Sequence, residues 1–240
     1  MKRTAVSFTG GKDCHLAMAR CLQTKQYEIV CLAIFHITDK QFKAHPIQWQ
    51  RAQARALGLP LCMYCVDPVD NCYKKGYARA IRQLKDEHEI DTIITGDIDY
   101  VGNSKTNFMS EVCETFVPDV TIHLPLWQED RTGILQEMIS QQQHDFHIIF
   151  SCVKEPLNAT WIGRRLDQKA VEDLQRLDID LTGENGEYHT MVLHAPNLYK
   201  TPLKLVDLDS LELKDQLGQK NERWWVCSYA TKLIWNSETE

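Results

Sequence analysis

Short apolar runs recur along the first half of the chain, and segments with helical patterning separate them. The run 29–35 is apolar nearly throughout, as in a strand covered on both faces. We expect strands at five places: 4–8, 29–35, 61–66, 92–95 and 120–124. We expect helices at four places: from Cys14 through Met18 and Cys21 to Leu22, over 48–57, over 71–88, and around 108–116. This alternation predicts an α/β fold with a parallel sheet, helices on both faces, and ligands at the carboxyl ends of the strands.

The pattern changes near residue 125. A helix is expected around 134–139, a strand over 146–153 and a helix over 166–177. Aromatic residues follow near the end of the chain, and we expect them to form an element that covers the body: Trp224, Trp225, Tyr229 and Trp235. The sequence therefore predicts two domains, 1–124 and 125–240, of which the second is a smaller α+β domain.

Composition narrows the classes of protein. The chain has 240 residues, 43% of them hydrophobic, and 27 basic against 33 acidic residues, for a net charge of −6. This balance excludes a disordered chain and argues against nucleic acid as a partner. No apolar run approaches the length of about 20 residues that a membrane span needs, and the first strand is too short for a secretory signal, so we predict a cytoplasmic protein.

The nine cysteines are expected to be reduced thiols. Cys62 and Cys65 have the spacing of a metal or redox pair. Alternation along a strand would point them to opposite faces, which favours buried thiols in the core over a shared site. Whether either cysteine has a further role stays open.

The strongest chemical signal is the segment Thr9-Gly10-Gly11-Lys12-Asp13-Cys14, between the first strand and the first helix. Its two glycines let backbone N–H groups approach an anion, and the helix directs its positive end to the same point. Lys12 adds a charge, and Asp13 can cap the helix or help to hold Mg²⁺. The alternative is a glycine turn with a solvated Lys–Asp pair. The strand-then-helix context favours a phosphate-binding loop, although the spacing differs from Walker A and from G-x-G-x-x-G.

A second signal is the acidic loop, residues 183–190, which reads Gly-Glu-Asn-Gly-Glu-Tyr-His-Thr. The carboxylates of Glu184 and Glu187 could bind Mg²⁺, accept a donor or act as a base. The residues alone favour a plainer interpretation, a polar hairpin between Leu181 and the apolar run 191–193.

Both segments resemble motifs of one family. The first is similar to the SGGKDS loop of the ATP pyrophosphatases, with Thr9 in place of the first Ser and Cys14 in place of the last. The acidic loop resembles the GEGGEYE(T/S) segment of the diphthine–ammonia ligase family, from which it departs at Asn185 and His189. Its matching positions are Glu184, Gly186, Glu187, Tyr188 and Thr190. The resemblance runs from about residue 4 to 205, and segment 96–108 departs from it after Gly96 and Asp97.

The resemblance implies a Rossmann-like sheet of the HUP type and an ATP-dependent ligase with ATP and Mg²⁺ as cofactors. By this resemblance, a carboxylate is adenylated, pyrophosphate leaves, and ammonia forms the amide; the acceptor would be diphthine on elongation factor 2. ATP would contact eight residues: Thr9, Gly10, Gly11, Lys12, Asp13, Cys14, His36 and Gly96. The acceptor would contact six: Asp97, Arg164, Glu184, Gly186, Glu187 and Tyr188. Catalytic roles would fall to four: Lys12, Asp13, Glu184 and Glu187.

Several alternatives stay open. His36 could contact adenine or simply end its strand, and Asp99 could assist Asp97 with Mg²⁺ or the acceptor. The same chemistry could serve a small carboxylate or a tRNA base, and a non-catalytic module that binds ATP or AMP is the other possibility. A homodimer is also left open.

Overall fold

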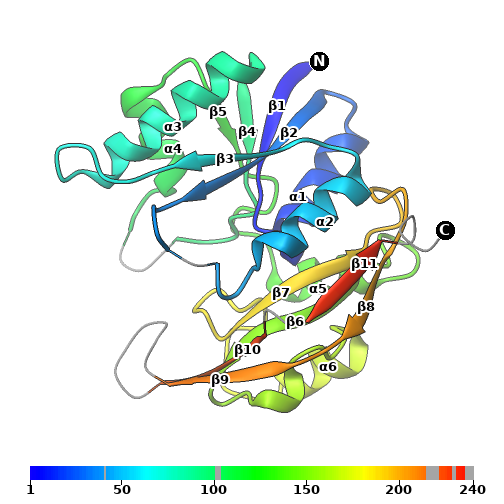
Figure 1. Ribbon diagram of the computed structural model, residues 1–240. Helices are drawn as coiled ribbons and strands as arrows, with labels where there is room; N and C mark the ends of the chain where they lie inside the picture. The colour runs from blue at the N-terminus through cyan, green and yellow to red at the C-terminus, as the bar shows by residue number, and fades with distance from the viewer. Residues whose placement is uncertain (41, 101–103, 215–221, 229–230, 236–240) are drawn as a thin grey trace. The chain divides into compact units, whose positions relative to one another are not determined.

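The computed structural model describes residues 1–40, 42–100, 104–214, 222–228 and 231–235, and its chain forms two compact units (Figure 1). Unit 1 contains Met1–Thr9, Asp13–Gln41 and Leu59–Gln128, and unit 2 contains Gly10–Lys12, Phe42–Gly58 and Glu129–Glu240. Tyr229 and part of the divergent segment, residues 101–103, lie outside the described residues. Within the described ranges, none of the helices has the length and apolar character that crossing a membrane requires. The division at residues 124 and 125 stays a prediction.

Unit 1 contains the parallel sheet that the apolar runs predict, with strand order β3-β2-β1-β4-β5 and every neighbouring pair parallel. Its strands are β1 (Lys2–Ser7), β2 (Tyr27–His36), β3 (Leu61–Cys65), β4 (Thr92–Ile94) and β5 (Thr121–His123). Its helices are α1 (Lys12–Gln23, whose first residue is grouped with unit 2), α3 (Tyr73–His88) and α4 (Phe108–Phe116). The expected Rossmann-like α/β class is confirmed.

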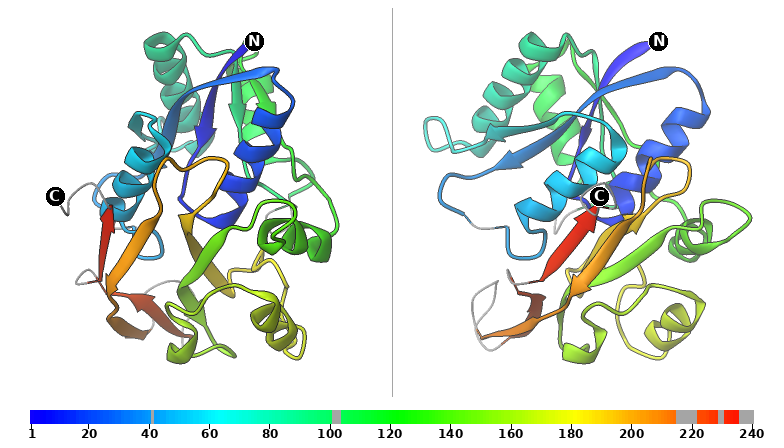
Figure 2. Two further views of the ribbon diagram at one scale, coloured as in Figure 1. Left: turned by 90° about the vertical axis from the view of Figure 1, so that its right-hand side faces the viewer. Right: turned by 45° about the vertical axis from the view of Figure 1, so that its right-hand side comes forward.

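Helices cover both faces of this sheet (Figure 2). The apolar sides of α3 and α4 pack on one face, where Ile81, Leu84 and Val112 share a core with Ala33 and Ile93. Helix α1 lies on the other face. This two-sided cover explains why the strands read as nearly continuous apolar runs.

The strand order reverses between β1 and β4, where Val6 pairs with Ile94. In open parallel sheets, ligands bind outside the carboxyl ends of the strands at such a reversal. The segments that leave β1 at Ser7 and β4 at Ile94 are therefore neighbours. One begins the phosphate loop, and the other carries Gly96 and Asp97.

Unit 2 contains two antiparallel sheets, ordered β7-β6-β10-β9 and β11-β8. Its strands are β6 (His147–Lys154), β7 (Tyr188–His194), β8 (Leu203–Asp207), β9 (Ser210–Lys214), β10 (Arg223–Cys227) and β11 (Lys232–Trp235). Its helices are α2 (Ile47–Leu57), α5 (Arg131–Ile139), the 3-10 turn η1 (Ala159–Trp161) and α6 (Gln168–Leu174). Helix α2 ends at Gly58, which adopts the left-handed conformation that glycine accommodates at the end of a helix.

The expectations for the tryptophan segment and for the helix over 166–177 were wrong. Strand β10, which contains Trp224 and Trp225, lies between β6 and β9, so these two tryptophans form part of the sheet and do not cover the body, whereas Trp235 ends β11 of the two-stranded sheet. The reason is packing, because Trp224 is 6% exposed and shares a small core with Cys152 and Val226. The helix expected over 166–177 is shorter and ends at Leu174.

Candidate functional site

The phosphate loop leaves β1 and enters α1 through a glycine in the left-handed conformation. Gly10 has φ +84°, and its carbonyl oxygen accepts bonds from Gln53 Nε2 at 2.8 Å and from the Val192 backbone N–H at 3.2 Å. A Cβ at Gly10 would lie 2.2 Å from Gln53 Oε1. Both the φ value and this close approach require glycine at this position.

Lys12 joins the phosphate loop to the acidic loop within unit 2. Its side chain is buried, 3% exposed, and Nζ donates to the Thr182 carbonyl oxygen at 2.6 Å. Its backbone N–H donates to Thr190 Oγ1 at 3.1 Å, across 178 residues of sequence. The ammonium also lies 5.5 Å from the centre of the Tyr188 ring, a cation–π distance. Lys12 therefore contacts both motifs that the sequence singles out.

The acidic loop is organised by its own backbone. The carboxylate of Glu187, 7% exposed, accepts bonds from the N–H groups of Asp180 at 3.0 Å and Asn185 at 3.1 Å. The Tyr188 hydroxyl donates to the Leu181 carbonyl at 2.5 Å. Residues 181–187 are turns, and the strand begins at Tyr188, so the simple hairpin from Leu181 is wrong. Glu187 holds this loop together.

The remaining acidic-loop residues differ in exposure. Glu184 is exposed, and its N–H donates to Asp180 Oδ1 at 3.2 Å. Gly186 has φ +75° with open space around its Cα, which lets the loop turn at the surface. Asp180 is fixed by Arg131, whose Nε lies 3.0 Å from Asp180 Oδ2. Hydrogen bonds from Thr182, Glu184 and this cation outweigh burial and lower the pKa of Asp180, which stays ionised.

Arg164 is engaged within unit 2. Its Nη2 lies 2.5 Å from Asp173 Oδ2, and the guanidinium lies 4.3 Å from the centre of the Trp161 ring. The bond from Arg164 lowers the pKa of Asp173. A role for Arg164 in binding an acceptor would have to coexist with these two contacts.

Unit 1 supplies the residues at the carboxyl ends of its strands. A Cβ at Gly96 would lie 2.6 Å from both the carbonyl carbon of Asp13 and the backbone nitrogen of Cys14, so glycine lets this segment contact the first turn of α1. Asp97 Oδ2 accepts a bond from Asn107 Nδ2 at 2.6 Å. Asn107 also caps α4, a role that fixes Asp97 relative to that helix.

The other residues expected to contact ATP lie at the ends of β1 and β2. Thr9 Oγ1 lies 3.9 Å from Cys14 Sγ, a weak contact within the loop. His36 is the last residue of β2, and its carbonyl accepts the Val66 N–H at 2.8 Å. This bond continues the pairing of β2 beyond the end of β3.

The donor set of unit 1 fits Mg²⁺. Asp13 stands in the first turn of α1, and Asp97 follows the glycine that contacts it. Magnesium is bound by one or two carboxylates with substrate phosphates and water completing its shell. Asp13 and Asp97 are carboxylates of the kind that such a site needs, and the expected role of Asp13 in holding Mg²⁺ stays a prediction.

The structure also brings together two histidines that the sequence does not pair. The rings of His45 and His189 lie 5.2 Å apart in an edge-to-face arrangement, and His45 Nδ1 is 3.5 Å from Met191 Sδ. Burial, followed by the charges of neighbouring groups including Lys12, lowers the pKa of His45 to about 3 and that of His189 to about 4. Both imidazoles are neutral at pH 7. In the sequence, His189 stands out only because it departs from the family motif. Nothing in the sequence marks His45 except its position directly before Pro46.

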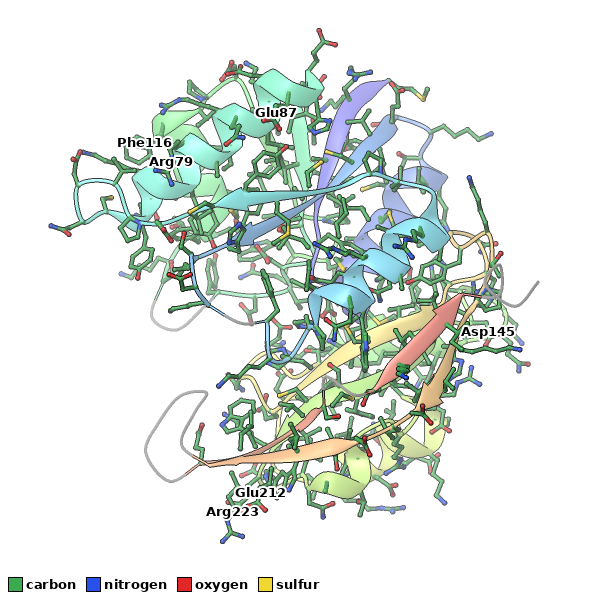
Figure 3. All side chains as sticks on the ribbon, in the orientation of Figure 1. Arg79, Glu87, Phe116, Asp145, Glu212 and Arg223 are labelled. Atoms are coloured by element: carbon green, nitrogen blue, oxygen red, sulfur yellow. The ribbon has the colours of Figure 1, made fainter. Side chains whose placement is uncertain are left out.

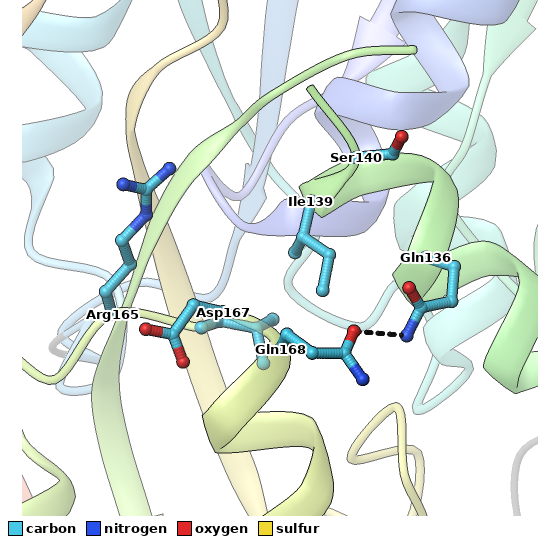
Figure 4. Close-up of a pocket in the computed structure, with 7 residues that line it drawn as sticks. Gln136, Ile139, Ser140, Arg165, Asp167 and Gln168 are labelled. Carbon is cyan, nitrogen blue, oxygen red and sulfur yellow. Dashed lines mark hydrogen bonds between the residues drawn. The ribbon is translucent and has the colours of Figure 1, made fainter. Parts of the chain in front are cut away.

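Unit 2 also has a surface pocket of about 180 Å³ between the end of α5 and the start of α6 (Figure 4). A bond between Gln136 and Gln168 at 3.0 Å crosses it, and Arg165 on its rim pairs with Asp145, which is labelled in Figure 3. Among the described residues, its lining includes none of the phosphate loop or the acidic loop. This pocket is separate from the candidate site.

Two family models match the chain. The diphthamide synthase N-terminal domain matches residues 1–117, and the diphthamide synthase C-terminal domain matches residues 131–229. Together the two matches include the phosphate loop, the Gly96 segment and the acidic loop, which follow one another in that order along the chain.

Curated proteins named diphthine–ammonia ligase are similar over most of the chain. The protein from Danio rerio is 24% identical over 228 residues, which cover 85% of each chain. The Homo sapiens protein is 24% identical over 240 residues, covering 88% of this chain and 84% of the relative. The Schizosaccharomyces pombe protein is 25% identical over 259 residues, covering 96% of this chain and 42% of its own length.

Solved structures show looser likenesses. A predicted subunit of a tRNA methyltransferase from Methanocaldococcus jannaschii has a TM-score of 0.45 and 16% identity, covering 82% of this chain and all of that one. A U34-tRNA thiolase from Methanococcus maripaludis, solved with its iron–sulfur cluster, has a TM-score of 0.40 and 15% identity over 60% of this chain and 59% of its own. At TM-scores this low, neither likeness assigns a reaction to this chain.

Proposed function

Because the chain belongs to the diphthine–ammonia ligase family, we propose that it is an ATP-dependent ligase that forms an amide from a carboxylate and ammonia. A carboxylate oxygen attacks the α-phosphorus of ATP, and pyrophosphate leaves with the bonding electrons. Ammonia then attacks the carbonyl carbon of the acyl-adenylate, loses a proton, and AMP departs. The acceptor that this family membership favours is the diphthine side chain of elongation factor 2.

The observation that carries this proposal is the position of Lys12. A cation at the start of a helix, beside two glycines, is suited to the charge that builds on a leaving pyrophosphate. The same residue bonds Thr182, which directly precedes the acidic loop, and Thr190, the last residue of that loop. An anion bound at the phosphate loop and a substrate bound at the acidic loop would therefore both depend on Lys12.

The other residues divide the remaining tasks. The backbone N–H groups of Gly10 and Gly11, with the Thr9 hydroxyl, would bind phosphate oxygens, and Asp13 with Asp97 would hold Mg²⁺. When bound, this ion supplies charge neutralisation between the phosphates. Glu184, which is exposed, would face the acceptor. In this assignment residues 1–124 bind ATP and residues 125–240 bind the acceptor.

We expect Lys12→Ala to lower the rate of pyrophosphate and AMP formation by about 100-fold or more, the usual cost of removing one preorganised donor of this kind. The assay supplies ATP, ammonium and elongation factor 2 that carries diphthine, and it measures both products. Lys200→Ala is the matched control, since Lys200 is an exposed lysine of the same unit. Circular dichroism and the melting temperature show whether Lys12→Ala still folds. A folded Lys12→Ala protein with the wild-type rate would contradict the mechanism.

The acceptor is tested separately. His189, Asn185 and the segment after Asp97 depart from the family pattern at positions that would meet the acceptor. AMP formation could depend on a small carboxylate or a tRNA and not on diphthine. That result would support the adenylation chemistry and would identify a different acceptor. Tight ATP binding without pyrophosphate release for any acceptor would identify a non-catalytic module.

A further inference from the structure

Unit 1 gathers two cysteines and a histidine that belong to neither of the two motifs. Cys31 lies on β2, Cys62 on β3 and His88 at the end of α3. Cys62 pairs with Ala33, so Cys31 stands two residues earlier on the neighbouring strand and faces the same side of the sheet. Helix α3 packs on this side, and His88 at its end lies close to the two thiols.

The side-chain atoms of the three residues lie close enough together to hold one metal ion. The two sulfurs and a ring nitrogen of His88 all lie within 4.8 Å of one another, and Cys62 Sγ is 3.3 Å from His88 Nε2. Zinc bond lengths of about 2.3 Å to sulfur and about 2.05 Å to nitrogen give tetrahedral edges of about 3.6 Å between S and N and about 3.8 Å between two sulfurs. Shifts of a few tenths of an ångström in the side chains would bring the S–N pair to that geometry.

Neighbouring residues hold the histidine end of this cluster in place. Arg3 Nη2 donates to the His88 carbonyl oxygen at 3.1 Å, and the Tyr64 hydroxyl donates to Glu87 Oε2 at 2.8 Å. Glu87 lies on α3, as Figure 3 shows, and His88 is the next and last residue of that helix. These bonds fix the end of α3, from which the His88 side chain extends toward the two thiols. Cys31 is fully buried, whereas Cys62 and His88 are partly exposed, which gives an ion a route from solvent.

We propose that Cys31, Cys62 and His88 bind one zinc ion that links β2, β3 and the end of α3. Thiolate and imidazole ligands select soft or borderline cations such as zinc over Mg²⁺ or Ca²⁺. The two thiols each release a proton to solvent on binding, and the two thiolates then balance the charge of Zn²⁺. Among the described residues the cluster contains these three ligands, so water takes the fourth position of the tetrahedron.

Cys65 provides a matched control. It lies on the same strand as Cys62, but its Sγ is 3.4 Å from Thr38 Oγ1 and lies near Arg79, outside the cluster. Cys62 and Cys65 therefore lie in different surroundings, as the alternation of side chains along a strand predicts. Replacing either one by serine changes one atom and leaves the backbone pattern intact.

The test measures zinc in the full chain, kept reduced, loaded with Zn²⁺ and passed through a desalting column. We expect about one zinc per wild-type chain and an affinity at least about 100-fold weaker in Cys62→Ser and His88→Ala, since even outer contacts are worth 10–100-fold. Cys65→Ser should bind zinc like the wild type. A wild-type chain that keeps no zinc, or equal losses in Cys62→Ser and Cys65→Ser, would overturn the site.

Cobalt gives a second measurement that needs only the folded wild-type protein. Co²⁺ in a tetrahedral site with thiolate ligands shows intense visible bands and a thiolate charge-transfer band in the near ultraviolet. We expect both on titration of the wild type, their displacement by added Zn²⁺, and their loss in Cys62→Ser. A folded wild-type chain that shows neither band would refute the proposal even if a variant failed to fold.

Discussion

Single residues at the phosphate loop are fixed by backbone geometry as much as by charge. Gly10 and Gly186 both adopt the left-handed conformation, with φ values of +84° and +75°. They differ in their surroundings, because a side chain at Gly10 would meet Gln53 and Met191, whereas nothing lies within 4 Å at Gly186. Substituting each of the two glycines therefore distinguishes the free-energy cost of backbone strain from the free-energy cost of crowding.

We expect Gly10→Ala to lower the free energy of unfolding by about 2–4 kcal/mol. About 1 kcal/mol comes from the left-handed conformation, and the rest from displacing the buried Gln53 side chain, which bonds two carbonyls. Gly186→Ala should show only the backbone part. Urea unfolding at equilibrium measures both variants. Equal losses would show that crowding at Gly10 contributes nothing.

At the scale of elements, helix α2 holds the phosphate loop against strand β7. Gln53 Nε2 donates to the carbonyl oxygens of Gly10 at 2.8 Å and Val192 at 2.9 Å. The loop's Gly10–Lys12 segment and α2 belong to the same compact unit as β7, although the sequence places them with the parallel sheet. The buried Gln53 amide donates to both carbonyl oxygens. It therefore fixes the position of the phosphate-loop backbone, which a loop of this length would not fix by itself.

Gln53→Ala should lower the free energy of unfolding by about 1–3 kcal/mol, the cost of leaving buried carbonyls with fewer donors. It should also raise the KM for ATP, because the Gly10 carbonyl loses one of the two hydrogen bonds that fix it. Gln48→Ala, at an exposed position of the same helix, is the control. Pyrophosphate release at varied ATP measures KM. An unchanged KM together with reduced stability would limit Gln53 to a structural role.

Elements differ in how far the sequence predicts them. The parallel sheet was predictable because its strands are buried on both faces, so their apolar runs stand out from the polar helices between them. Strands β8 and β9 were missed because their apolar residues are partly solvent-exposed, as at Val206 and Leu211, which weakens the alternation. The loop between β1 and α1 was predictable because its glycine motif is local, while its binding of phosphate stays a prediction. The bond from Lys12 to Thr190 and the pairing of His45 with His189 join distant segments, and no local pattern encodes them.

At the scale of the whole molecule, partly buried histidines with lowered pKa values link the fold to pH. Burial lowers the pKa of five histidines among the described residues: His45, His123, His147, His189 and His194. Such groups bind protons less readily in the folded chain than in the unfolded chain. Acid therefore favours the unfolded state through these residues, in addition to any effect of the carboxylates.

The largest part of this acid sensitivity should come from the pair beside Lys12. His189 has a folded pKa of about 4 against an ordinary value of 6.5, so its contribution is lost as the pH falls below about 6.5 and stops changing near pH 4. Between about pH 7 and about pH 5 the wild type should lose about 2 kcal/mol more of its free energy of unfolding than His189→Gln, since a tenfold change in proton affinity corresponds to about 1.4 kcal/mol. Urea unfolding at several pH values measures the difference. His194→Gln is the control, because the negative charge of Asp145 opposes the effect of burial there. If His189→Gln and the wild type lose stability in parallel as the pH falls, His189 is not held neutral by the fold.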